Sequence, residues 1–269
     1  MPESVLYEVQ GGIALVTLNR PESLNSMSGD MLDSLAAHLA SAAQDPEVRC
    51  VVVTGAGRAF TAGGDVKGMA AAPRAEGISG APRPLISSAE GLRRQEESSR
   101  LLYEMPKPTI AAVNGPAAGA GMSLALAADI RIASEAARFA TAFARIAISG
   151  DFGGTWLLQR LVGPARAKEL YLLAEVLDAQ RALALGLVSK VVPADQLMPE
   201  AMALAQRLAD GPTLAYGRIK DNFSYGATAT FGDTLTREAE NLVASMRTED
   251  HRAAAVAFVE KREPVFRGR

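Results

Sequence analysis

One apolar stretch, residues 109–129, most constrains how this chain can fold. Its sequence, TIAAVNGPAAGAGMSLALAAD, predicts a strand at 109–113, a turn at 114–116, small residues at 117–121 and an apolar helix at 122–128. A strand that turns through glycine into a helix leaves backbone N–H groups free at the helix N-terminus. Such groups suit an anion or a developing oxyanion, although small residues here can also serve only to pack the helix on a sheet.

A second stretch, residues 50–69, shows the same order of features. An apolar strand at 50–54 leads through a turn to the small residues Ala62, Gly63 and Gly64, which precede Asp65. Two turns of this kind can each direct one N–H group at the same oxygen atom. The first stretch does not predict a nucleotide phosphate loop, because no Lys-Ser/Thr pair follows its glycines and the dinucleotide fingerprint is not matched.

Elsewhere the pattern alternates strands with helices and then becomes wholly helical. Residues 4–19 predict a hairpin that turns at Gly11 and Gly12, and Ser28 predicts the N-cap of an amphipathic helix. This rhythm is typical of a layered α/β fold. The other expected elements are a loop at 70–88, a polar helix at 87–104, a strand at 129–133, an ambiguous segment at 139–148, helices at 153–161 and 163–174, a short helix capped by Asp178, a strand at 187–192, and helices at 196–209, 213–225, 231–246 and 248–261.

Composition excludes several classes of protein. The 269 residues include 28 basic and 30 acidic side chains, so a non-specific nucleic-acid binder is not expected. The single Cys50 rules out an internal disulfide and favours a reducing compartment. Neither a membrane-spanning run nor a signal peptide is evident, which makes the cytoplasm the expected location. No cluster of His, Cys and acidic residues predicts a metal site, and His38 and His251 lie far from both stretches.

Six segments in order along the chain match one known family. The chain resembles the crotonase, or enoyl-CoA hydratase/isomerase, superfamily through VTLNRPESLNSMS at 16–28, TGAGRAFTAGGD at 54–65, KPTIAAVNGPAAGAG at 107–121, GDFGGTWLLQRLVG at 150–163, ALGLVSKVVP at 184–193 and AFVEKREPVF at 257–266. The segments AAGAG and DFGGTWLL are most similar to the isomerase branch of phenylacetate breakdown.

The resemblance implies both a fold and an assembly. The fold class it implies is α/β, a crotonase-like spiral of strand-strand-helix repeats with a C-terminal helical trimerisation region. We therefore expect a core with the acyl-CoA site at 1–195 and a helical region at 196–269 that builds a homotrimer or a pair of trimers. The expected partner is an acyl-CoA substrate, whose coenzyme A is not a separate cofactor, and neither nucleic acid nor membrane is expected to bind.

The family's shared chemistry is stabilisation of a thioester enolate by two backbone N–H groups. The resemblance places these donors at Gly64 and Ala120, where most relatives have glycine at the second position. Alanine there adds only a methyl group, so its N–H can still donate if its backbone angles suit alanine. Contacts to the coenzyme A portion are expected, by the same resemblance, from Arg20, Leu24, Ser26, Ala62, Gly64, Asp65, Val66, Lys67 and Ala120, and from Phe258 and Lys261 of a neighbouring subunit.

The acid/base positions depart from the hydratase pattern, in which two glutamates hold one water molecule. These positions fall on Ser123 and Phe143, and neither side chain can act as a general base. A carboxylate remains at Asp151, which matches the base of the isomerase branch but as bare sequence is also a possible helix cap. The aromatic residues nearby, Phe143, Phe152 and Trp156, either form an apolar pocket that raises the pKa of Asp151 or are ordinary core residues.

One carboxylate without a water-holding partner suits proton transfer better than hydration. We therefore expect an enoyl-CoA isomerase in which Asp151 moves a proton from the α-carbon to the γ-carbon of a 3-enoyl thioester. The alternatives are an enoyl-CoA hydratase, a ring-expanding isomerase of an aromatic epoxide thioester, an aspartate-nucleophile dehalogenase or thioesterase, and a binding protein without turnover.

Overall fold

The computed structural model describes residues 3–66 and 85–269, so Lys67 and most of the loop expected at 70–88 lie outside the described residues. The expected hairpin opens the fold, and both of its turn glycines adopt positive φ, which residues without a Cβ do readily. Four further strands continue the hairpin in parallel, in the order β1-β2-β3-β4-β6-β9. These six strands are β1 (Val5–Gln10), β2 (Ile13–Leu18), β3 (Cys50–Gly55), β4 (Thr109–Val113), β6 (Ile130–Ser134) and β9 (Lys190–Val192).

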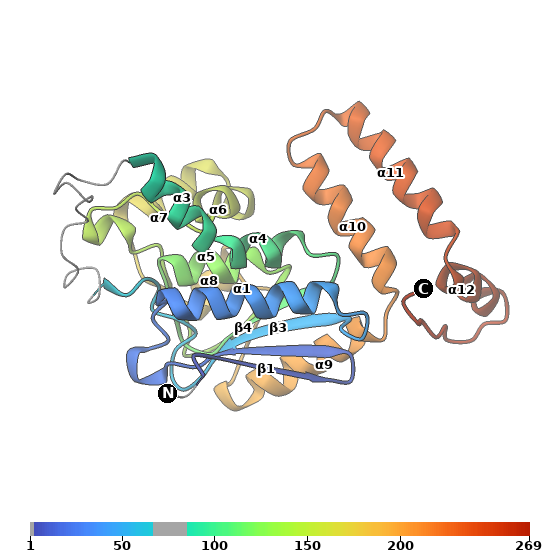
Figure 1. Cartoon of the computed structure of the whole chain (residues 1–269), viewed down its shortest axis with the longest axis horizontal. Coiled ribbons are helices and arrows are strands. Elements are labelled where there is room, and N and C mark those ends of the chain that lie inside the picture. Colours follow the sequence, from blue (N-terminus) through green and yellow to red (C-terminus); the bar gives the residue numbers. More distant parts are fainter. Residues whose placement is uncertain (1–2, 67–84) are drawn as a thin grey trace.

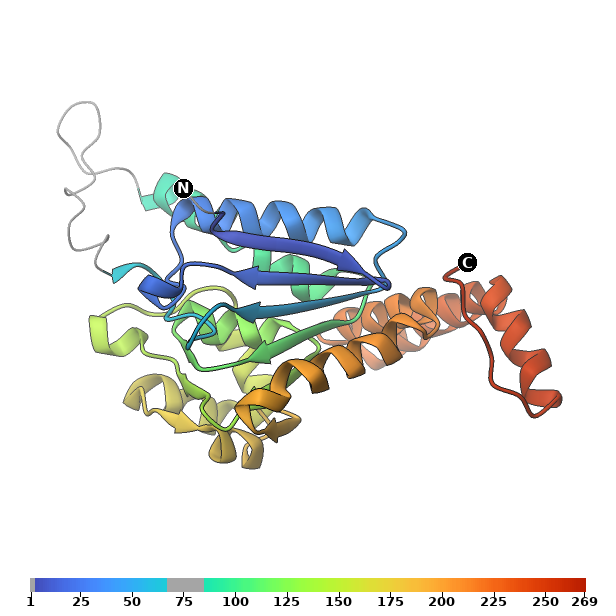
Figure 2. The ribbon, with the colours of Figure 1, turned by 90° about the horizontal axis from the view of Figure 1, so that it is seen from below.

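Helices cover both faces of this sheet, and strand β3 shows why. Its side chains alternate between two hydrophobic clusters, with Val51 and Val53 in one and Cys50 and Val52 in the other. The first cluster is closed by α1 (Gly29–Gln44), α4 (Glu97–Glu104) and α5 (Ala120–Ala127). The N-cap of α1, Ser28, accepts from an amide of the first turn, as expected. The second is closed by α9 (Leu197–Ala209), which lies on the opposite face (Figure 2).

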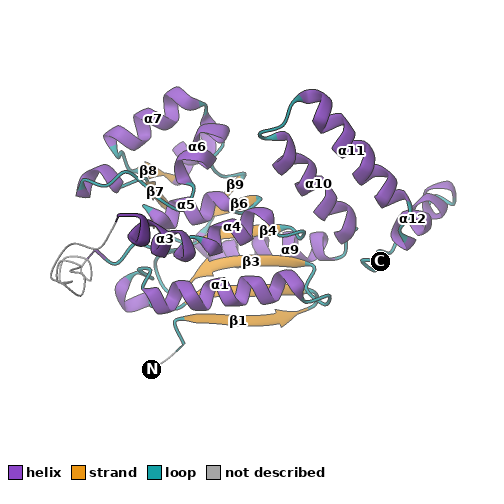
Figure 3. Cartoon of the chain, turned by 45° about the horizontal axis from the view of Figure 1, so that its top comes forward, coloured by secondary structure: helices purple, strands orange, loops and turns teal. Residues whose placement is uncertain are grey.

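A second, three-stranded sheet was not expected from the sequence. It consists of β5 (Pro116–Ala118), β7 (Arg138–Ala140) and β8 (Leu177–Asp178), in the order β5-β7-β8 (Figure 3). The ambiguous segment at 139–148 divides into β7 and the 3-10 helix η2 (Phe143–Ile146). Two helices, α6 (Gly154–Val162) and α7 (Pro164–Leu173), lie between β7 and β8 in the chain, and α8 (Ala179–Ala184) follows β8. Asp178 caps α8 as expected.

Two boundaries differ from expectation. The polar helix expected at 87–104 is two helices, α3 (Leu85–Gln95) and α4 (Glu97–Glu104), with a turn at Glu96 between them. Residues 85–88, expected in a loop, therefore belong to α3, and the strand expected at 187–192 begins only at Lys190. Short 3-10 helices also occur at η1 (Pro21–Ser23) and η3 (Ala194–Gln196).

The C-terminal helices extend away from the sheet. The α10 (Thr213–Gly226) and α11 (Phe231–Met246) helices form an antiparallel pair, and α12 (Glu249–Val259) follows at the far end of the molecule (Figure 1). Large apolar side chains are exposed on this arm, with Phe223, Phe231 and Phe258 at 77%, 81% and 85% exposure. The expected trimer stays a prediction for this surface. Among the described helices, none is long and apolar enough to cross a membrane.

A partly buried ion pair fastens the arm to the sheet. The Nζ of Lys220 on α10 lies 2.8 Å from Oδ2 of Asp129 and donates at 3.0 Å to the carbonyl oxygen of Lys107. The same Oδ2 accepts from the amide of Thr109 at 2.8 Å, at the first residue of β4. The charge on Asp129 is therefore compensated by groups from two elements, and removing one of them leaves it poorly solvated.

We predict that Lys220→Ala lowers the free energy of unfolding by about 2–3 kcal/mol, because Asp129 keeps its charge without its cation. Urea denaturation measures the loss. Lys190→Ala is the matched control, because Lys190 pairs with Glu200 at 2.7 Å on the exposed surface. That pair should contribute about 1 kcal/mol or less. Equal losses in the two variants would contradict the anchoring role of Lys220.

Candidate active site

Two asparagines hold the turn that follows β3. The Nδ2 of Asn25 lies within 2.8–3.2 Å of the carbonyl oxygens of Ala56, Ala59 and Phe60. The Nδ2 of Asn114, in the turn after β4, lies 2.9 Å from the carbonyl oxygens of Gly55 and Gly57 and 3.1 Å from that of Ala59. Buried carbonyl groups need such donors, so the loop from Gly55 to Phe60 is fixed by side chains from two other segments.

The two glycine-containing turns are also joined to each other through their backbones. The amide of Thr61 donates to the carbonyl of Pro116 and the amide of Ala118 donates back to the carbonyl of Thr61, both at 3.1 Å. The amide of Met27 donates to the carbonyl of Gly63 at 2.8 Å on the other side. Residues 61–64 are therefore held between the segment around Met27 and strand β5.

Close approach explains the small residues in both turns. A Cβ atom on Gly115 would lie 2.0 Å from the carbonyl oxygen of Arg58, and one on Gly121 would lie 2.6 Å from that of Thr61. A Cβ atom on Gly63 would lie 2.4 Å from the carbonyl oxygen of Ala118 and 3.4 Å from the amide nitrogen of Ala120. The small residues thus serve packing, and the same packing brings the segment before Gly64 beside Ala120.

Both expected oxyanion donors keep an unused N–H group. In the described part of the chain, the amides of Gly64 and Ala120 donate to no protein acceptor. Ala120 is the first residue of α5 (Ala120–Ala127), so its N–H lies at a helix N-terminus. The left-handed conformation in this turn falls on Gly119, at φ +54°, and Ala120 does not require it. Alanine is therefore compatible with the backbone at this position.

Asp151 lies just before α6 and does not cap it. The N-cap residue is Gly153, and no side chain bonds to the first turn, so the interpretation of Asp151 as a helix cap is wrong. Its Oδ1 is buried and has no hydrogen-bond partner among the described residues. Burial, together with the negative charge of Glu96, raises the pKa of Asp151 from 3.8 to about 6.

Ser123 and Phe143, the residues expected at the two hydratase glutamate positions, both contact Tyr171. Ser123 is buried on α5, and the ring of Phe143 stacks on that of Tyr171 with centroids 5.8 Å apart. A Cβ atom on Gly154 would lie 2.2 Å from the Oγ of Ser123 and 2.4 Å from the hydroxyl oxygen of Tyr171. Burial raises the pKa of Tyr171 to about 12, and the charge of Asp151 contributes in the same direction. A serine and two stacked rings thus occupy the space beside Asp151.

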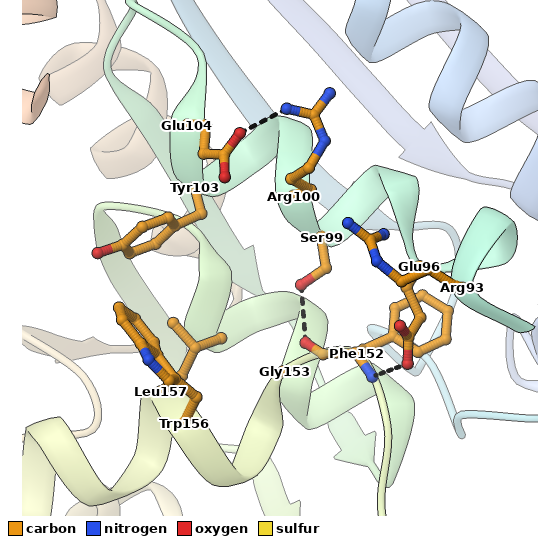
Figure 4. Close-up of a pocket in the computed structure, with 10 residues that line it drawn as sticks. All are labelled: Arg93, Glu96, Ser99, Arg100, Tyr103, Glu104, Phe152, Gly153, Trp156 and Leu157. Atoms are coloured by element: carbon orange, nitrogen blue, oxygen red, sulfur yellow. Dashed lines mark hydrogen bonds and ion pairs between the residues drawn. The ribbon is translucent and has the colours of Figure 1, made fainter. Parts of the chain in front are cut away.

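Trp156 belongs to a neighbouring cavity of about 290 Å³ between α4 and α6 (Figure 4). Its ring meets that of Tyr103 edge to face at 5.2 Å, and the guanidinium of Arg160 lies 3.5 Å from its centroid. Phe152 also lines this cavity. The pKa of Asp151 is raised first by burial and then by the charge of Glu96, a residue that the sequence analysis did not anticipate.

The residues expected to bind coenzyme A divide into two groups. Near the turns, the Nη1 of Arg20 donates to the carbonyl of Ser26 at 2.6 Å, and the amide of Ala62 donates to the carbonyl of Leu24 at 2.9 Å. Asp65 and Val66 follow directly after Gly64, whereas Lys67 lies outside the described residues. Phe258 lies on α12 and Lys261 follows two residues after its end, and Figure 1 shows α12 remote from the segment that ends at Val66. One chain does not bring these two groups together.

Four residues near the site escaped the sequence analysis: Glu96, Ser99, Tyr103 and Tyr171. Glu96 and Ser99 belong to what the sequence predicts as a polar helix, and nothing local distinguishes them from solvated side chains. Tyr103 and Tyr171 occur at helical spacing with other apolar residues, as core residues do.

The fold and its turns agree with one family of known proteins. The family described as enoyl-CoA hydratase/isomerase matches residues 8–269. The chain belongs to this family. It is 40% identical over 269 residues, the full length of both chains, to a 1,2-epoxyphenylacetyl-CoA isomerase of Escherichia coli (strain K12). It is 36% identical over 261 residues to a short-chain-enoyl-CoA hydratase of Clostridium acetobutylicum, covering 97% of this chain and 96% of that protein.

Solved structures of this family show the same fold. The enoyl-CoA hydratase of Bacillus anthracis superposes with a TM-score of 0.89 at 31% identity, covering 99% of this chain and 100% of that one. The expectation of a crotonase α/β fold with C-terminal helices is therefore confirmed, and this enoyl-CoA hydratase/isomerase family member is an enzyme of acyl-CoA thioesters.

We predict that Asp151→Asn stabilises the folded enzyme at neutral pH. The folded-state pKa of about 6 exceeds the ordinary value of 3.8, so the native chain holds this proton more tightly than the unfolded chain. The stability from this proton is present below the unfolded pKa and is lost as pH rises through 6. The free energy of unfolding of the variant should exceed that of the parent by about 1 kcal/mol at neutral pH, allowing for solvent near the carboxyl, and by less in acid.

Urea denaturation at about pH 7.5 and about pH 4.5 measures both margins. Asp195→Asn, at an exposed carboxyl, controls for the loss of one negative charge. A margin that does not change between the two pH values would contradict the raised pKa of Asp151.

Proposed function

We propose that this enzyme is an enoyl-CoA isomerase that moves a double bond into conjugation with the thioester. The observation that supports this most is the chemistry around Asp151, a half-buried carboxyl whose Oδ1 has no partner in the described chain. Its pKa is raised to about 6, which keeps it ionised at neutral pH and makes it a better base than an ordinary aspartate. The hydratase's two glutamates are absent, because Ser123 and Phe143 stand in their places.

In the proposed reaction, the carboxylate of Asp151 removes a proton from the α-carbon of a 3-enoyl-CoA. The electron pair of that C–H bond moves into the conjugated system, and the thioester oxygen becomes negative. The N–H groups of Gly64 and Ala120 stabilise this dienolate, and removal of one oxyanion donor from an enzyme typically costs about 2.7–4 kcal/mol. Asp151 then returns the proton to the γ-carbon, which yields the 2-enoyl thioester and restores the carboxylate.

The coenzyme A portion is proposed to lie along the turn formed by Arg20, Leu24, Ser26 and Ala62, next to Asp65, Val66 and Lys67. Phe258 and Lys261 would then contact the coenzyme A of a neighbouring subunit in a trimer or hexamer. The exposed aromatic side chains of the C-terminal arm support such an assembly.

The alternative is an enoyl-CoA hydratase, which the names of several relatives favour. Hydration needs a base that activates water and an acid that protonates the α-carbon. Asp151 alone would have to perform both steps. Of two relatives that are 40% identical to this chain, one is named a probable enoyl-CoA hydratase and the other a 1,2-epoxyphenylacetyl-CoA isomerase, so an aromatic epoxide substrate belongs among the first thioesters to be tested.

We predict that the purified enzyme converts a 3-enoyl-CoA into a 2-enoyl-CoA and that Asp151→Asn lowers kcat about 100-fold or more, because the base is lost. The absorbance of the conjugated thioester measures the reaction. The rate should fall as pH decreases through about 6, where Asp151 takes up its proton. Loss of absorbance from a supplied 2-enoyl-CoA would instead indicate hydration, and full isomerase activity in Asp151→Asn would exclude this base.

We also predict that Gly121→Ala lowers kcat about 10- to 100-fold with a smaller effect on KM, because a misplaced oxyanion donor acts on the transition state. The new methyl group would lie 2.6 Å from the carbonyl oxygen of Thr61 and would push the two turns apart. Gly91→Ala is the matched control, because Gly91 is also helical and its Cβ atom would meet nothing within 4 Å. Circular dichroism checks that both variants fold. Equal kcat values in Gly121→Ala and Gly91→Ala would argue against the oxyanion role of the turns.

A further inference from the structure

The junction between α3 and α4 reaches across to the residue that follows Asp151. Oε1 of Glu96 accepts a hydrogen bond from the amide of Phe152 at 3.0 Å, and the hydroxyl of Ser99 donates to the carbonyl oxygen of Phe152 at 2.8 Å (Figure 4). Both backbone groups of one residue are therefore held by side chains more than fifty positions earlier in the chain.

Phe152 has a backbone conformation that needs such support. Its φ is +52°, in the left-handed region that residues with a Cβ seldom adopt, and its side chain is buried. A strained residue of this kind persists only where surrounding contacts fix it. Because Asp151 is covalently joined to Phe152, the direction of its carboxyl group depends on these two hydrogen bonds.

Charge distinguishes Glu96 from Ser99. On α3 and α4, Arg100 pairs with Glu97 and Glu104, and Arg93 lies 4.0 Å from Glu97. No cation pairs with Glu96 within the described residues. Glu96 therefore presents an uncompensated negative charge toward Asp151 from α3–α4.

Tyr171, on α7, also interacts with Asp151, because the negative charge of Asp151 contributes to the raised pKa of the Tyr171 hydroxyl. Among the residues that the structure describes, Glu96 and Tyr171 are the titratable side chains with an electrostatic interaction with Asp151.

We propose that Glu96 is a positioning residue for Asp151: its carboxylate holds the backbone at Phe152 and places a second negative charge beside the reacting carboxyl. This assignment deepens the proposed function and rests on Asp151 being the base. Glu96 is engaged with an amide, so it does not transfer protons itself. Its charge disfavours the ionised form of Asp151, and burial acts in the same direction, so that the pKa of the base rises.

The two contributions of Glu96 can be separated by substitution. Glu96→Gln keeps an oxygen that accepts from the amide of Phe152 but removes the charge. Ser99→Ala keeps the charge but removes the bond to the carbonyl of Phe152. Glu90→Gln, at an exposed position on α3, is the matched control for loss of one negative charge.

The decisive measurement is the titration of Asp151 by ¹³C NMR of aspartate carboxyl groups in the intact enzyme, with the signal assigned through Asp151→Asn. Glu96→Gln should move this titration, and the acidic limb of the kcat profile, to lower pH by roughly 0.5–1 unit. Glu90→Gln should move neither. Ser99→Ala should leave the titration in place and lower kcat by roughly fivefold, with little change in KM.

A titration of Asp151 that is the same in Glu96→Gln and in the parent enzyme would overturn the assignment of Glu96, whatever the activity. An unchanged kcat in Ser99→Ala would overturn the role of the Phe152 backbone. Full turnover by Asp151→Asn would instead remove the proposed function, and the NMR titration, which needs no turnover, would still report separately on the charge of Glu96.

Discussion

The site depends on contact between two backbones. The turn after β3 and the turn after β4 approach so closely that a single added carbon at Gly63, Gly115 or Gly121 would meet a carbonyl oxygen. Hydrogen bonds between Thr61 and strand β5 fix the relative position of the two turns. The side-chain amides of Asn25 and Asn114 donate to carbonyl oxygens of the turn after β3. This arrangement holds the two turns that carry the amides of Gly64 and Ala120 rigidly beside each other, and rigid donors need no reorganisation when charge develops.

In the proposed function, the acid/base group comes from a different part of the chain than the two glutamates of a hydratase. The two positions on α5 and η2 hold a serine and a phenylalanine, and the carboxyl that remains is on the loop before α6. Its partner carboxylate comes from the junction of α3 and α4 and bonds a backbone amide. The fold is therefore the same as that of the enoyl-CoA hydratases with solved structures, whereas the proposed acid/base chemistry depends on one carboxyl in place of two.

How much of this was predictable from sequence depends on the range of the interactions involved. The hairpin at Gly11-Gly12, the helix capped by Ser28 and the helix capped by Asp178 were confirmed, because turns and caps are set by neighbouring residues. The second sheet was not expected, since strands of two or three residues show no period. Glu96 was missed for a related reason, because its contact with Phe152 spans 56 positions and leaves no local pattern.

The left-handed conformation of Phe152 shows the same limit more sharply. Glycine and asparagine adopt positive φ more readily than other residues, and Gly119 and Asn25 are examples in this chain. At Phe152 the backbone is hydrogen-bonded by Glu96 and Ser99, and a large aromatic residue in the sequence gives no sign of the positive φ. The family resemblance located Asp151, but only the tertiary structure showed what holds it.

Cys50 has a consequence of another kind. It is fully buried on β3, and burial raises the pKa of its thiol to about 12, so the reactive thiolate is virtually absent from the native protein. The sheet would have to open before an alkylating reagent could reach the sulfur. Since this is the chain's one cysteine, chemical modification of its thiol reports exposure of the central sheet without interference from other thiols. Its labelling rate therefore reports how often the central sheet opens.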